Sequence, residues 1–378
     1  MKVALVHDWL TGMRGGERCL EAFCELYPQA DIYTLLYLPG TVSQTIEKHK
    51  IHTSFINLIN SKRYYRHCLP LFPTAIASFD FAEYDLILSS SHCVAKGVRV
   101  PKGVCHIAYL FTPMRYIWDQ YDIYFNKTNT VYPVRIAMKM VRPYLQHWDT
   151  HSNNDVYAFV AISSFVGERI ARYYNRTSDV IYPPVDLERF SASTQDNGFY
   201  LMVTALVPYK RVDLAITAFN QLKLPLKIIG VGPEEGRLKA IAGSTIEFLG
   251  DKSDADVSCA YADCRALIFP GEEDFGIVPL EAMAAGKPVI AYGKGGVTET
   301  VVSLNGEYPT GLFFDEQTPK SLMDAVLSFE KCKNKFDPMR IHDHVKSFDK
   351  AQFKKKMTAY IDQTMQRFKK EQHAKAAS

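Results

Sequence analysis

The residues whose types and spacing best suit chemistry are two glutamates, Glu273 and Glu281, with seven residues between them. Glu273 lies in a loop of three consecutive acids, and Glu281 falls in the first turn of an expected helix, so both can face one ligand. Gly276 lies between them, and the helix is expected from about Pro279 because proline is favoured at the first helical position. Free amides at a helix start, with the dipole behind them, bind anions. A purely structural role, as an exposed loop acid or as a glutamate at a helix start, would explain each glutamate alone. It does not explain why acids lie on both sides of an anion-binding helix start.

Two adjacent cations, Lys210 and Arg211, lie between an expected strand and an expected helix. A solvated helix start is the structural explanation, yet positive charges oppose the dipole at a helix N-terminus. Lysine and arginine also bind phosphate groups through charge-assisted hydrogen bonds. We therefore interpret the two side chains as partners of a bound diphosphate.

Three glycine-containing turns, at 12–16, 230–232 and 295–296, each follow an expected strand and precede an expected helix. Such a turn exposes free backbone amides at the carboxyl edge of a sheet, where open α/β sheets bind ligands. The first turn, with Gly15 and Gly16, suits a phosphate or a sugar, although glycine in each turn could also serve the backbone angles alone. The first turn is not G-x-G-x-x-G, and no acidic residue is placed to bind a dinucleotide ribose. Both observations argue against a nicotinamide-dependent oxidoreductase.

Short apolar runs that alternate with helical patterns predict two parallel sheets covered by helices on both faces. The expected strands are 2–6, 86–88, 106–110, 157–161, 180–181, 200–203, 226–229, 246–249, 266–269 and 289–291, and the expected helices are 17–27, 163–174, 212–222, 253–262, 279–285, 320–330 and 348–375. The boundary between the two domains is expected at the double proline Pro183-Pro184 and the polar run 191–198. Neither segment fits inside a helix or a strand. We therefore expect an N-terminal domain at 1–188, a C-terminal domain at 189–345 and a basic C-terminal helix at 346–378.

Composition indicates a globular protein whose small net charge does not suit general nucleic-acid binding. The chain of 378 residues is 47% hydrophobic and 22% charged, with a formal net charge of +3. This composition excludes a disordered chain, and any anion binding must be local. The eight cysteines contain no CxxC pair, and we expect reduced thiols and no metal site. No apolar run approaches the ~20 residues that span a bilayer, and we expect no secretion signal.

The E-x7-E block within EEDFGIVPLEAMAAGKPVIAYGKGGVTETV resembles the signature of retaining glycosyltransferase family 4. The resemblance extends over nearly the whole chain, through the early GG loop, YPPVD, VPYKRVDLAI, IIGVGPE, FLG and TGLFF. FTPMRYIWDQY and SSSHCVAKGV resemble GDP-mannose-dependent mannosyltransferases of bacterial O-antigen and related polysaccharides. The resemblance implies the α/β GT-B fold, with two Rossmann-like domains facing across a cleft and a C-terminal helix that crosses back to the N-terminal domain.

The resemblance also implies a role for each matching residue. Glu273 would hold sugar hydroxyls near the reacting carbon, Glu281 would accept hydrogen bonds from the ribose, and Lys210 would bind phosphate with Arg211 beside it. The remaining donor-binding residues would be Gly15 and Gly16 near sugar and diphosphate, and Phe275, Gly276, Ile277 and Val278 after the acids. The base pocket would be lined by Phe248, Leu249 and Gly250 with Asp251 and Lys252 after them.

The chain departs from the family pattern at two positions. Many members carry an arginine five residues before the phosphate lysine, where this chain has Ala205. Many relatives carry a histidine before Thr-Pro-Met-Arg-Tyr, where this chain has Phe111. His92, after an expected strand, is the nearest alternative for a catalytic histidine, although a lone histidine is more often structural.

The resemblance implies transfer of a hexose, mannose from GDP-mannose, with retention, to a hydroxyl of a lipid-linked glycan in the synthesis of lipopolysaccharide or another cell-surface polysaccharide. We expect the reaction to be metal-independent. A UDP-sugar-dependent transferase and a non-catalytic sugar-nucleotide-binding scaffold are the alternatives. Basic segments with apolar neighbours, at 62–67 before 69–72 and at Arg135, Lys139 and Arg142, suit an anionic membrane, although a solvated helix face is also open. We therefore expect a cytoplasmic protein, peripheral on the inner face of the membrane.

Overall fold

The computed structural model describes residues 1–59, 65–125 and 130–377, and it divides into two compact units. The N-terminal unit comprises Met1–Pro184 together with the C-terminal residues from Ala351, and the C-terminal unit comprises Val185–Lys350. The first boundary lies a few residues before the one expected after residue 188. The second lies a few residues after the one expected at 345, because the turn before the last helix belongs to the C-terminal unit.

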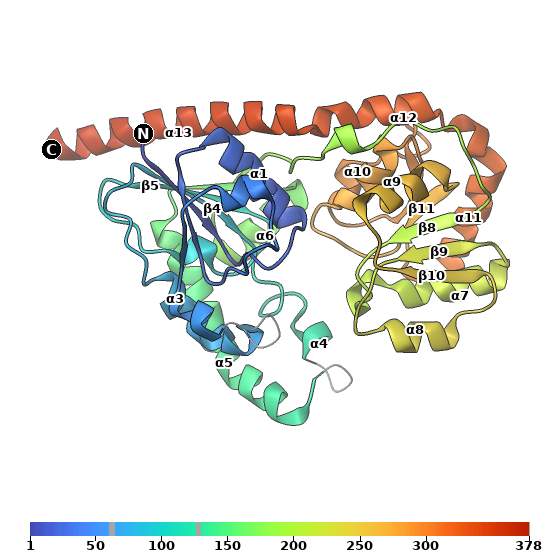
Figure 1. The fold of residues 1–378 in the computed structure, drawn as a ribbon, viewed down its shortest axis with the longest axis horizontal. Helices are drawn as coiled ribbons and strands as arrows, with labels where there is room; N and C mark the ends of the chain where they lie inside the picture. The colour runs from blue at the N-terminus through green and yellow to red at the C-terminus, as the bar shows by residue number, and fades with distance from the viewer. Residues whose placement is uncertain (60–64, 126–129, 378) are drawn as a thin grey trace. The chain divides into compact units, whose positions relative to one another are not determined.

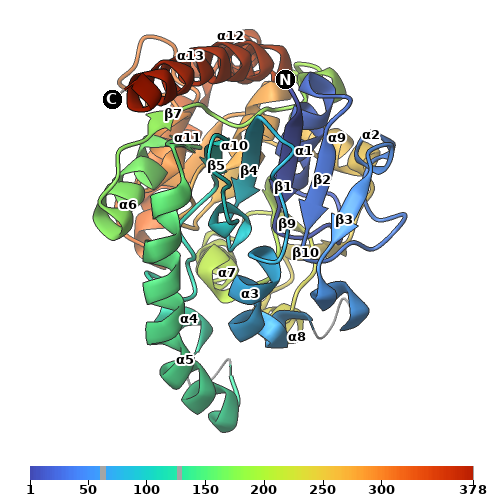
Figure 2. The ribbon, with the colours of Figure 1, turned by 90° about the vertical axis from the view of Figure 1, so that its left-hand side faces the viewer.

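The N-terminal unit is built on a seven-stranded parallel sheet with the order β3-β2-β1-β4-β5-β6-β7, part of which is visible face-on in Figure 2. The strands are β1 (Val3–His7), β2 (Asp31–Thr34), β3 (Ile51–Thr53), β4 (Leu86–Ser91), β5 (Cys105–Leu110), β6 (Ala158–Ala161) and β7 (Asp179–Val180). Every residue of β1, β4, β5 and β6 is buried, as a sheet covered on both faces requires. The strands β2 and β3 had not been expected, because each is short and includes polar residues.

Helices cover both faces of this sheet (Figure 1). They are α1 (Gly15–Leu26), α2 (Gln44–Glu47), α3 (Phe72–Ile76), α4 (Tyr121–Tyr124), α5 (Tyr132–His151), α6 (Ser164–Tyr174) and α13 (Lys350–Ala377). The sequence gives α6 clear ends. The side chain of Ser163 accepts a hydrogen bond from the amide of Val166 at its start, and Asn175 adopts the left-handed conformation at its end.

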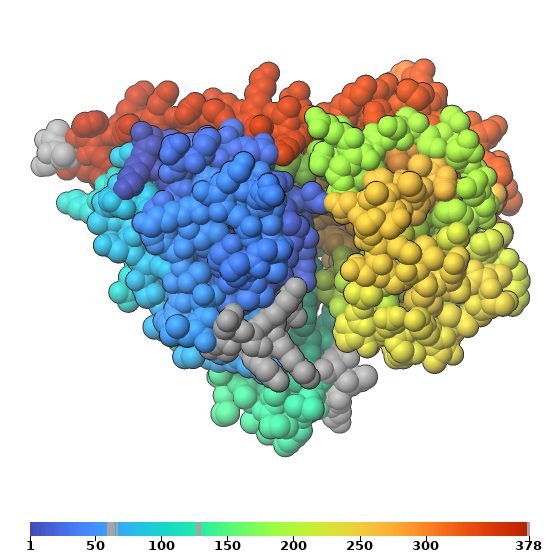
Figure 3. All heavy atoms as spheres, viewed as in Figure 1, coloured from blue at the N-terminus to red at the C-terminus, as the bar shows by residue number. Residues whose placement is uncertain are grey.

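The C-terminal helix α13 packs against α1 and β5 of the N-terminal unit. The ring of Phe353 lies 5.5 Å from that of Phe23 and 5.6 Å from that of Tyr109, and Lys354 forms a 2.9 Å ion pair with Glu25. In the space-filling view of Figure 3 the red residues of this helix lie directly against the blue N-terminal residues. The last helix therefore completes the hydrophobic layer over the first sheet.

The C-terminal unit has a six-stranded parallel sheet with the order β10-β9-β8-β11-β12-β13. Its strands are β8 (Tyr200–Val203), β9 (Leu226–Ile229), β10 (Ile246–Gly250), β11 (Ala266–Phe269), β12 (Val289–Tyr292) and β13 (Gly311–Phe314). Its helices are α7 (Val212–Leu222), α8 (Glu235–Ile241), α9 (Asp254–Asp263), α10 (Ile277–Ala284), α11 (Pro319–Cys332) and α12 (Pro338–Val345). Within the described residues, no helix combines the length and apolar character that crossing a bilayer requires.

Each sheet has one point where consecutive connections leave in opposite directions. In the N-terminal unit β1 lies between β2 and β4, and in the C-terminal unit β8 lies between β9 and β11. Loops that follow the two strands at such a switch point separate from each other and leave a crevice at the carboxyl edge, where open α/β sheets bind ligands. Residues just after β1, β4, β8 and β11 are therefore the first candidates for function.

We predict that removing the Phe353 ring destabilises the N-terminal unit. Because the ring is buried between two aromatic side chains, Phe353→Ala should lower the free energy of unfolding by about 3–5 kcal/mol. The exposed neighbour on the same helix, Lys355→Ala, should change it by less than about 0.5 kcal/mol. Urea unfolding followed by circular dichroism measures both, and equal effects would contradict the packing of α13.

Candidate functional site

At the switch point of the C-terminal unit, the ammonium group of Lys210 forms an ion pair with Oε1 of Glu273. Lys210 ends the 3₁₀ turn η6 (Pro208–Lys210) after β8, and Glu273 lies in the loop after β11. Both side chains are 17% exposed, so the pair is shielded but remains open to solvent. The structure therefore joins the two residues that the family resemblance assigned to phosphate and to sugar.

Arg211 points elsewhere than Lys210. It is the N-cap of α7 with a φ of +53°, and its guanidinium lies 3.4 Å from Asp213 Oδ1 and 3.4 Å from Gln317 Oε1. The carboxylate of Asp213, in the first turn of α7, offsets the positive charge that this helix start would otherwise disfavour. Gln317 in turn donates a hydrogen bond to the carbonyl of Pro270, 2.8 Å away, and so ties this region to the loop after β11.

The helix after the acidic loop begins earlier than expected. Gly276 is the N-cap of α10, with a φ of +90° that favours glycine, and the helix starts at Ile277 rather than near Pro279. Pro279 is the third helical residue and is still tolerated, because amides in the first turn have no partner within the helix. The expected first-turn position of Glu281 is wrong for the same reason, since it is the fifth residue of α10.

Glu281 has partners of its own within the C-terminal unit. Its carboxylate accepts a 3.1 Å hydrogen bond from the hydroxyl of Tyr261 and lies 3.9 Å from the guanidinium of Arg189. Burial, together with this carboxylate, holds the pKa of the Tyr261 hydroxyl well above its ordinary value, so it stays a hydrogen-bond donor. Sequence reasoning missed Tyr261 and Arg189, because neither lies in a motif around Glu281.

The glycine turn at 295–296 holds the acidic loop in place. The amide of Gly296 donates a 2.9 Å hydrogen bond to the carbonyl of Glu273, and Glu273 forms an isolated bridge with Gly295. A Cβ at Gly295 would lie 2.3 Å from that carbonyl, and one at Gly296 would lie 2.4 Å from the carbonyl of Asp274. These two glycines therefore permit a close approach of two backbones.

The turn at 230–232 has a similar packing role. A Cβ at Gly230 or Gly232 would collide with the carbonyls of Thr204 or Leu206, in the loop after β8. Gly250 ends β10, at the edge of the sheet, with a φ of +70°, and Asp251 after it is exposed. Their expected place in a base pocket stays a prediction.

At the switch point of the N-terminal unit, the fully buried carboxylate of Asp8 organises the loop after β4. It accepts hydrogen bonds from the amides of residues 92–95, at 2.6–3.0 Å, and lies 3.1 Å from Nδ1 of His92. Burial by itself would raise the pKa of Asp8, but the imidazole and amide of His92 outweigh it and lower the pKa to about 2. Sequence analysis missed Asp8, although it directly follows the first strand.

The structure brings His92, the Gly15-Gly16 turn and Phe111 to one edge of the N-terminal sheet. The ring of His92 lies 6.4 Å from that of Phe111, which is also 6.3 Å from the ring of His7. A Cβ at Gly16 would lie 3.4 Å from Phe111 and 3.5 Å from His7, so this glycine leaves room for both rings. Burial lowers the pKa of His7 to about 4, which keeps it neutral at physiological pH.

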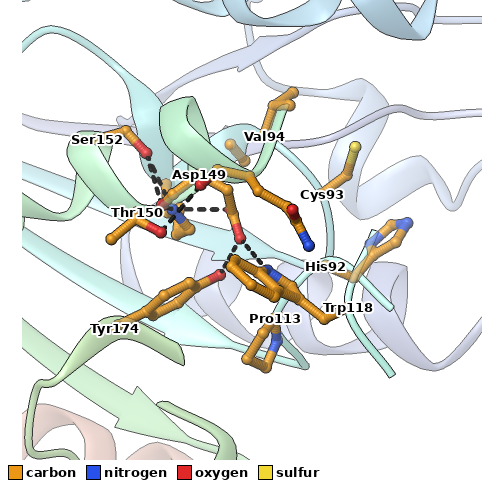
Figure 4. A network of polar contacts seen from close by, with 12 residues as sticks. His92, Cys93, Val94, Pro113, Trp118, Asp149, Thr150, Ser152 and Tyr174 are labelled. Carbon is orange, nitrogen blue, oxygen red and sulfur yellow. Dashed lines mark hydrogen bonds and ion pairs between the residues drawn. The ribbon is translucent and has the colours of Figure 1, made fainter. Parts of the chain in front are cut away.

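A buried ion pair supports the same loop from its other end (Figure 4). The ammonium group of Lys96 lies 3.1 Å from Oδ1 of Asp149 and donates a 2.7 Å hydrogen bond to its carbonyl. The indole of Trp118 and the hydroxyl of Tyr174 both point at the other carboxylate oxygen, at 2.7 and 3.0 Å. Each formal charge in this core therefore has a partner.

Several residues of the basic segments expected to meet a membrane are buried or form contacts inside the N-terminal unit. Residues 62–64 lie outside the described residues, and Tyr65, Leu69 and Phe72 are buried. On α5, Arg142 turns inward, because its Nε donates a 2.9 Å hydrogen bond to the carbonyl of Ile117 and its guanidinium lies 4.1 Å from the centre of the Tyr121 ring. Lys139 on the same helix is exposed as expected.

Residues 186–342, which contain Lys210, Glu273 and Glu281, match the sequence model of the family Glycosyl transferases group 1. An uncharacterized glycosyltransferase of Methanocaldococcus jannaschii, MJ1178, is 31% identical over 173 residues, which cover 44% of this chain and 48% of that protein. The O-antigen chain mannosyltransferase C of Escherichia coli is 26% identical over 170 residues, which cover 40% of this chain and 45% of that protein. The chain thus spans about half the length of these curated relatives.

The structure of HepE from Anabaena in complex with UDP-glucose superimposes with a TM-score of 0.69 over 96% of this chain and 100% of that chain, at 17% identity. The chain has the GT-B fold. The two Rossmann-like α/β domains of the GT-B fold, which the resemblance implied, are therefore confirmed. Within the GT-B fold, the Lys210–Glu273 pair lies in the unit that the family model matches, and the Asp8–His92 pair lies in the other unit.

We predict that Gly295→Ala displaces the acidic loop. Its φ of +86° and the close carbonyl of Glu273 leave no room for a methyl group, and the strain should cost about 1–3 kcal/mol of unfolding free energy. Gly236→Ala on α8, with open space around the Cβ position, is the matched control and should be neutral or slightly stabilising. Thermal unfolding compares the two variants, and an unchanged melting temperature for Gly295→Ala would contradict the close approach.

Proposed function

We propose that this protein is a retaining glycosyltransferase that moves mannose from GDP-mannose to a hydroxyl of a lipid-linked glycan in cell-surface polysaccharide synthesis. The observation that carries the proposal is the Lys210–Glu273 ion pair at the switch point of the C-terminal sheet, beside the Gly276 start of α10. A cation, an acid and a helix start at one sheet edge provide partners for a diphosphate and for sugar hydroxyls.

In the proposed reaction, the bond between the anomeric carbon and the diphosphate oxygen breaks, and a bond from that carbon to the acceptor oxygen forms on the same face. The acceptor proton passes to the leaving phosphate. Lys210 would exchange Glu273 for the diphosphate and stabilise its developing charge together with the amides at the start of α10. Glu273, once released, would accept hydrogen bonds from sugar hydroxyls. We propose that these groups replace a metal ion, so that transfer persists in EDTA.

The choice of mannose is supported by the O-antigen chain mannosyltransferase among the matched relatives and by the resemblance of the N-terminal motifs. A UDP-sugar is the second candidate donor, because HepE, which shares the fold, is seen with UDP-glucose. A non-catalytic binder is the third candidate, because Ala205 and Phe111 stand where many relatives carry arginine and histidine.

We predict that GDP-mannose and GDP bind in calorimetric titrations without added metal, and that UDP-glucose and UDP do not. Lys210→Ala should weaken GDP binding at least about tenfold, because a charge-assisted hydrogen bond contributes about 1.5–3 kcal/mol. The exposed Lys331→Ala on α11 is the matched control and should bind as the wild type does. Binding of the UDP ligands alone would contradict the mannose assignment. Bound GDP-mannose that is never hydrolysed or transferred would favour the non-catalytic binder.

We also propose that α5 meets an anionic membrane surface that carries the acceptor. Its exposed face bears apolar side chains at four-residue spacing, at Tyr132, Ile136, Met140 and Tyr144, with Lys139 among them. The only acid of this helix, Asp149, is buried in its ion pair with Lys96. Apolar side chains flanked by cations and free of exposed acids suit a negatively charged lipid surface.

We predict that the protein co-sediments with phosphatidylcholine vesicles containing about 30% phosphatidylglycerol, and much less with pure phosphatidylcholine. Met140→Asp places a charge on a side chain that is 71% exposed on this face and should lower the partition coefficient at least about tenfold. Met339→Asp, at a methionine 56% exposed in the C-terminal unit, is the matched control. Equal binding of both variants would remove α5 from the membrane contact.

A further inference from the structure

The contact between Asp8 and His92 favours a proton on one particular ring nitrogen of the histidine. Oδ1 of Asp8 accepts the amides of Val94 and Ala95, and Oδ2 accepts the amides of His92 and Cys93. The low pKa of Asp8 keeps the carboxylate ionised, and an ionised carboxylate only accepts hydrogen bonds. Nδ1 of His92 lies 3.1 Å from Oδ2 of this carboxylate, so Nδ1 is the nitrogen placed to carry a proton towards Asp8, and Nε2 is the nitrogen outside this contact.

The surroundings of the ring leave its other side available. His92 is 33% exposed, and its ring packs edge-on against Trp9, with centroids 4.5 Å apart. Among the residues that the structure describes, no hydrogen bond is formed by Nε2. The ring follows β4, which neighbours β1 at the switch point where parallel sheets bind ligands.

The loop that carries His92 is held from both ends. Asp8 binds its first four amides, and the fully buried Lys96, just after them, forms an ion pair with Asp149. Because both supports are buried and charged, a shift of the loop would break charge-assisted hydrogen bonds in the interior, which is costly. The histidine is therefore presented by a rigid support.

We propose that Asp8 is a positioning residue that orients His92, and that Nε2 of His92 accepts a hydrogen bond from a sugar hydroxyl bound at this edge of the N-terminal unit. The inference rests on the proposed function for the presence of a sugar. It adds a residue that the sequence motifs did not indicate, and it gives the Nε2 atom of His92 a defined partner.

The first test needs no enzymatic activity. In a ¹⁵N–¹H correlation spectrum of histidine-labelled protein at pH 7.5, we expect the His92 ring, identified by its loss in His92→Gln, to carry its proton on Nδ1. A proton on Nε2, or rapid averaging between the two nitrogens, would overturn the orientation by Asp8. Because this measurement uses the wild-type fold, it stands even if Asp8 variants do not fold.

The second test is a double-mutant cycle on kcat and KM for GDP release from GDP-mannose. We expect His92→Ala to lower kcat about 100-fold with little change in KM, and His92→Gln, which keeps a polar atom near the Nε2 position, to retain more activity. Asp8→Asn should lower kcat at least about tenfold in the wild type but less than about threefold in the His92→Ala background. If Asp8 only stabilised the fold, Asp8→Asn would lower kcat by the same factor in both backgrounds. That outcome would overturn the proposal.

Two reactions distinguish the donor hydroxyl from the acceptor hydroxyl. If His92 contacts the donor sugar, His92→Ala should slow GDP release both in water alone and with octyl α-mannoside as acceptor. If it contacts the acceptor, only the second rate should fall. If His92→Ala changes neither rate, the proposed contact with a sugar hydroxyl is overturned. The exposed His147→Gln on α5 is the matched control. A wild type that binds none of the four nucleotide ligands, yet shows the Nδ1 proton, would count against the proposed function and not against the role of Asp8.

Discussion

Parallel pairing places the carboxyl ends of all strands of a sheet at one edge, and both candidate sites depend on this constraint. At each switch point, the chain leaves one strand in one direction and the adjacent strand in the opposite direction. The loops that follow these two strands therefore separate and leave the edge of the sheet open between them. Polar side chains in those loops can then meet although they are far apart in the chain. Lys210 meets Glu273 in this way in one unit, and Asp8 meets His92 in the other.

The two pairs differ in how fully their carboxylates are used. Asp8 is fully buried, and its two oxygens accept four amides and an imidazole, so it has little capacity left for a ligand and acts on its own loop. Glu273 is partly exposed and pairs through one oxygen with the equally exposed Lys210, so both side chains remain accessible to solvent. Burial thus separates a carboxylate that positions its own loop from one that remains open to solvent.

Much of the fold followed from local sequence. Continuous apolar runs predicted the buried strands β1, β5 and β8, and the helix α7 was expected within its observed bounds. The edge strand β3 was missed, because three partly exposed residues carry too little apolar pattern. The start of α10 was misplaced, because proline is accepted throughout the first helical turn, and Gly276 with its positive φ marked the true beginning.

The sequence by itself determined the two α/β units, because apolar runs, helix caps and tight turns depend on neighbouring residues. It also marked Lys210, Glu273, Glu281 and the glycine turns as candidate site residues. Only the tertiary structure decided which of these residues touch. Lys210 and Glu273 are 63 residues apart, and Asp8 and His92 are 84 residues apart. Their contact depends on which strands are neighbours in the sheet, and that order arises from the packing of the whole unit rather than from any local pattern.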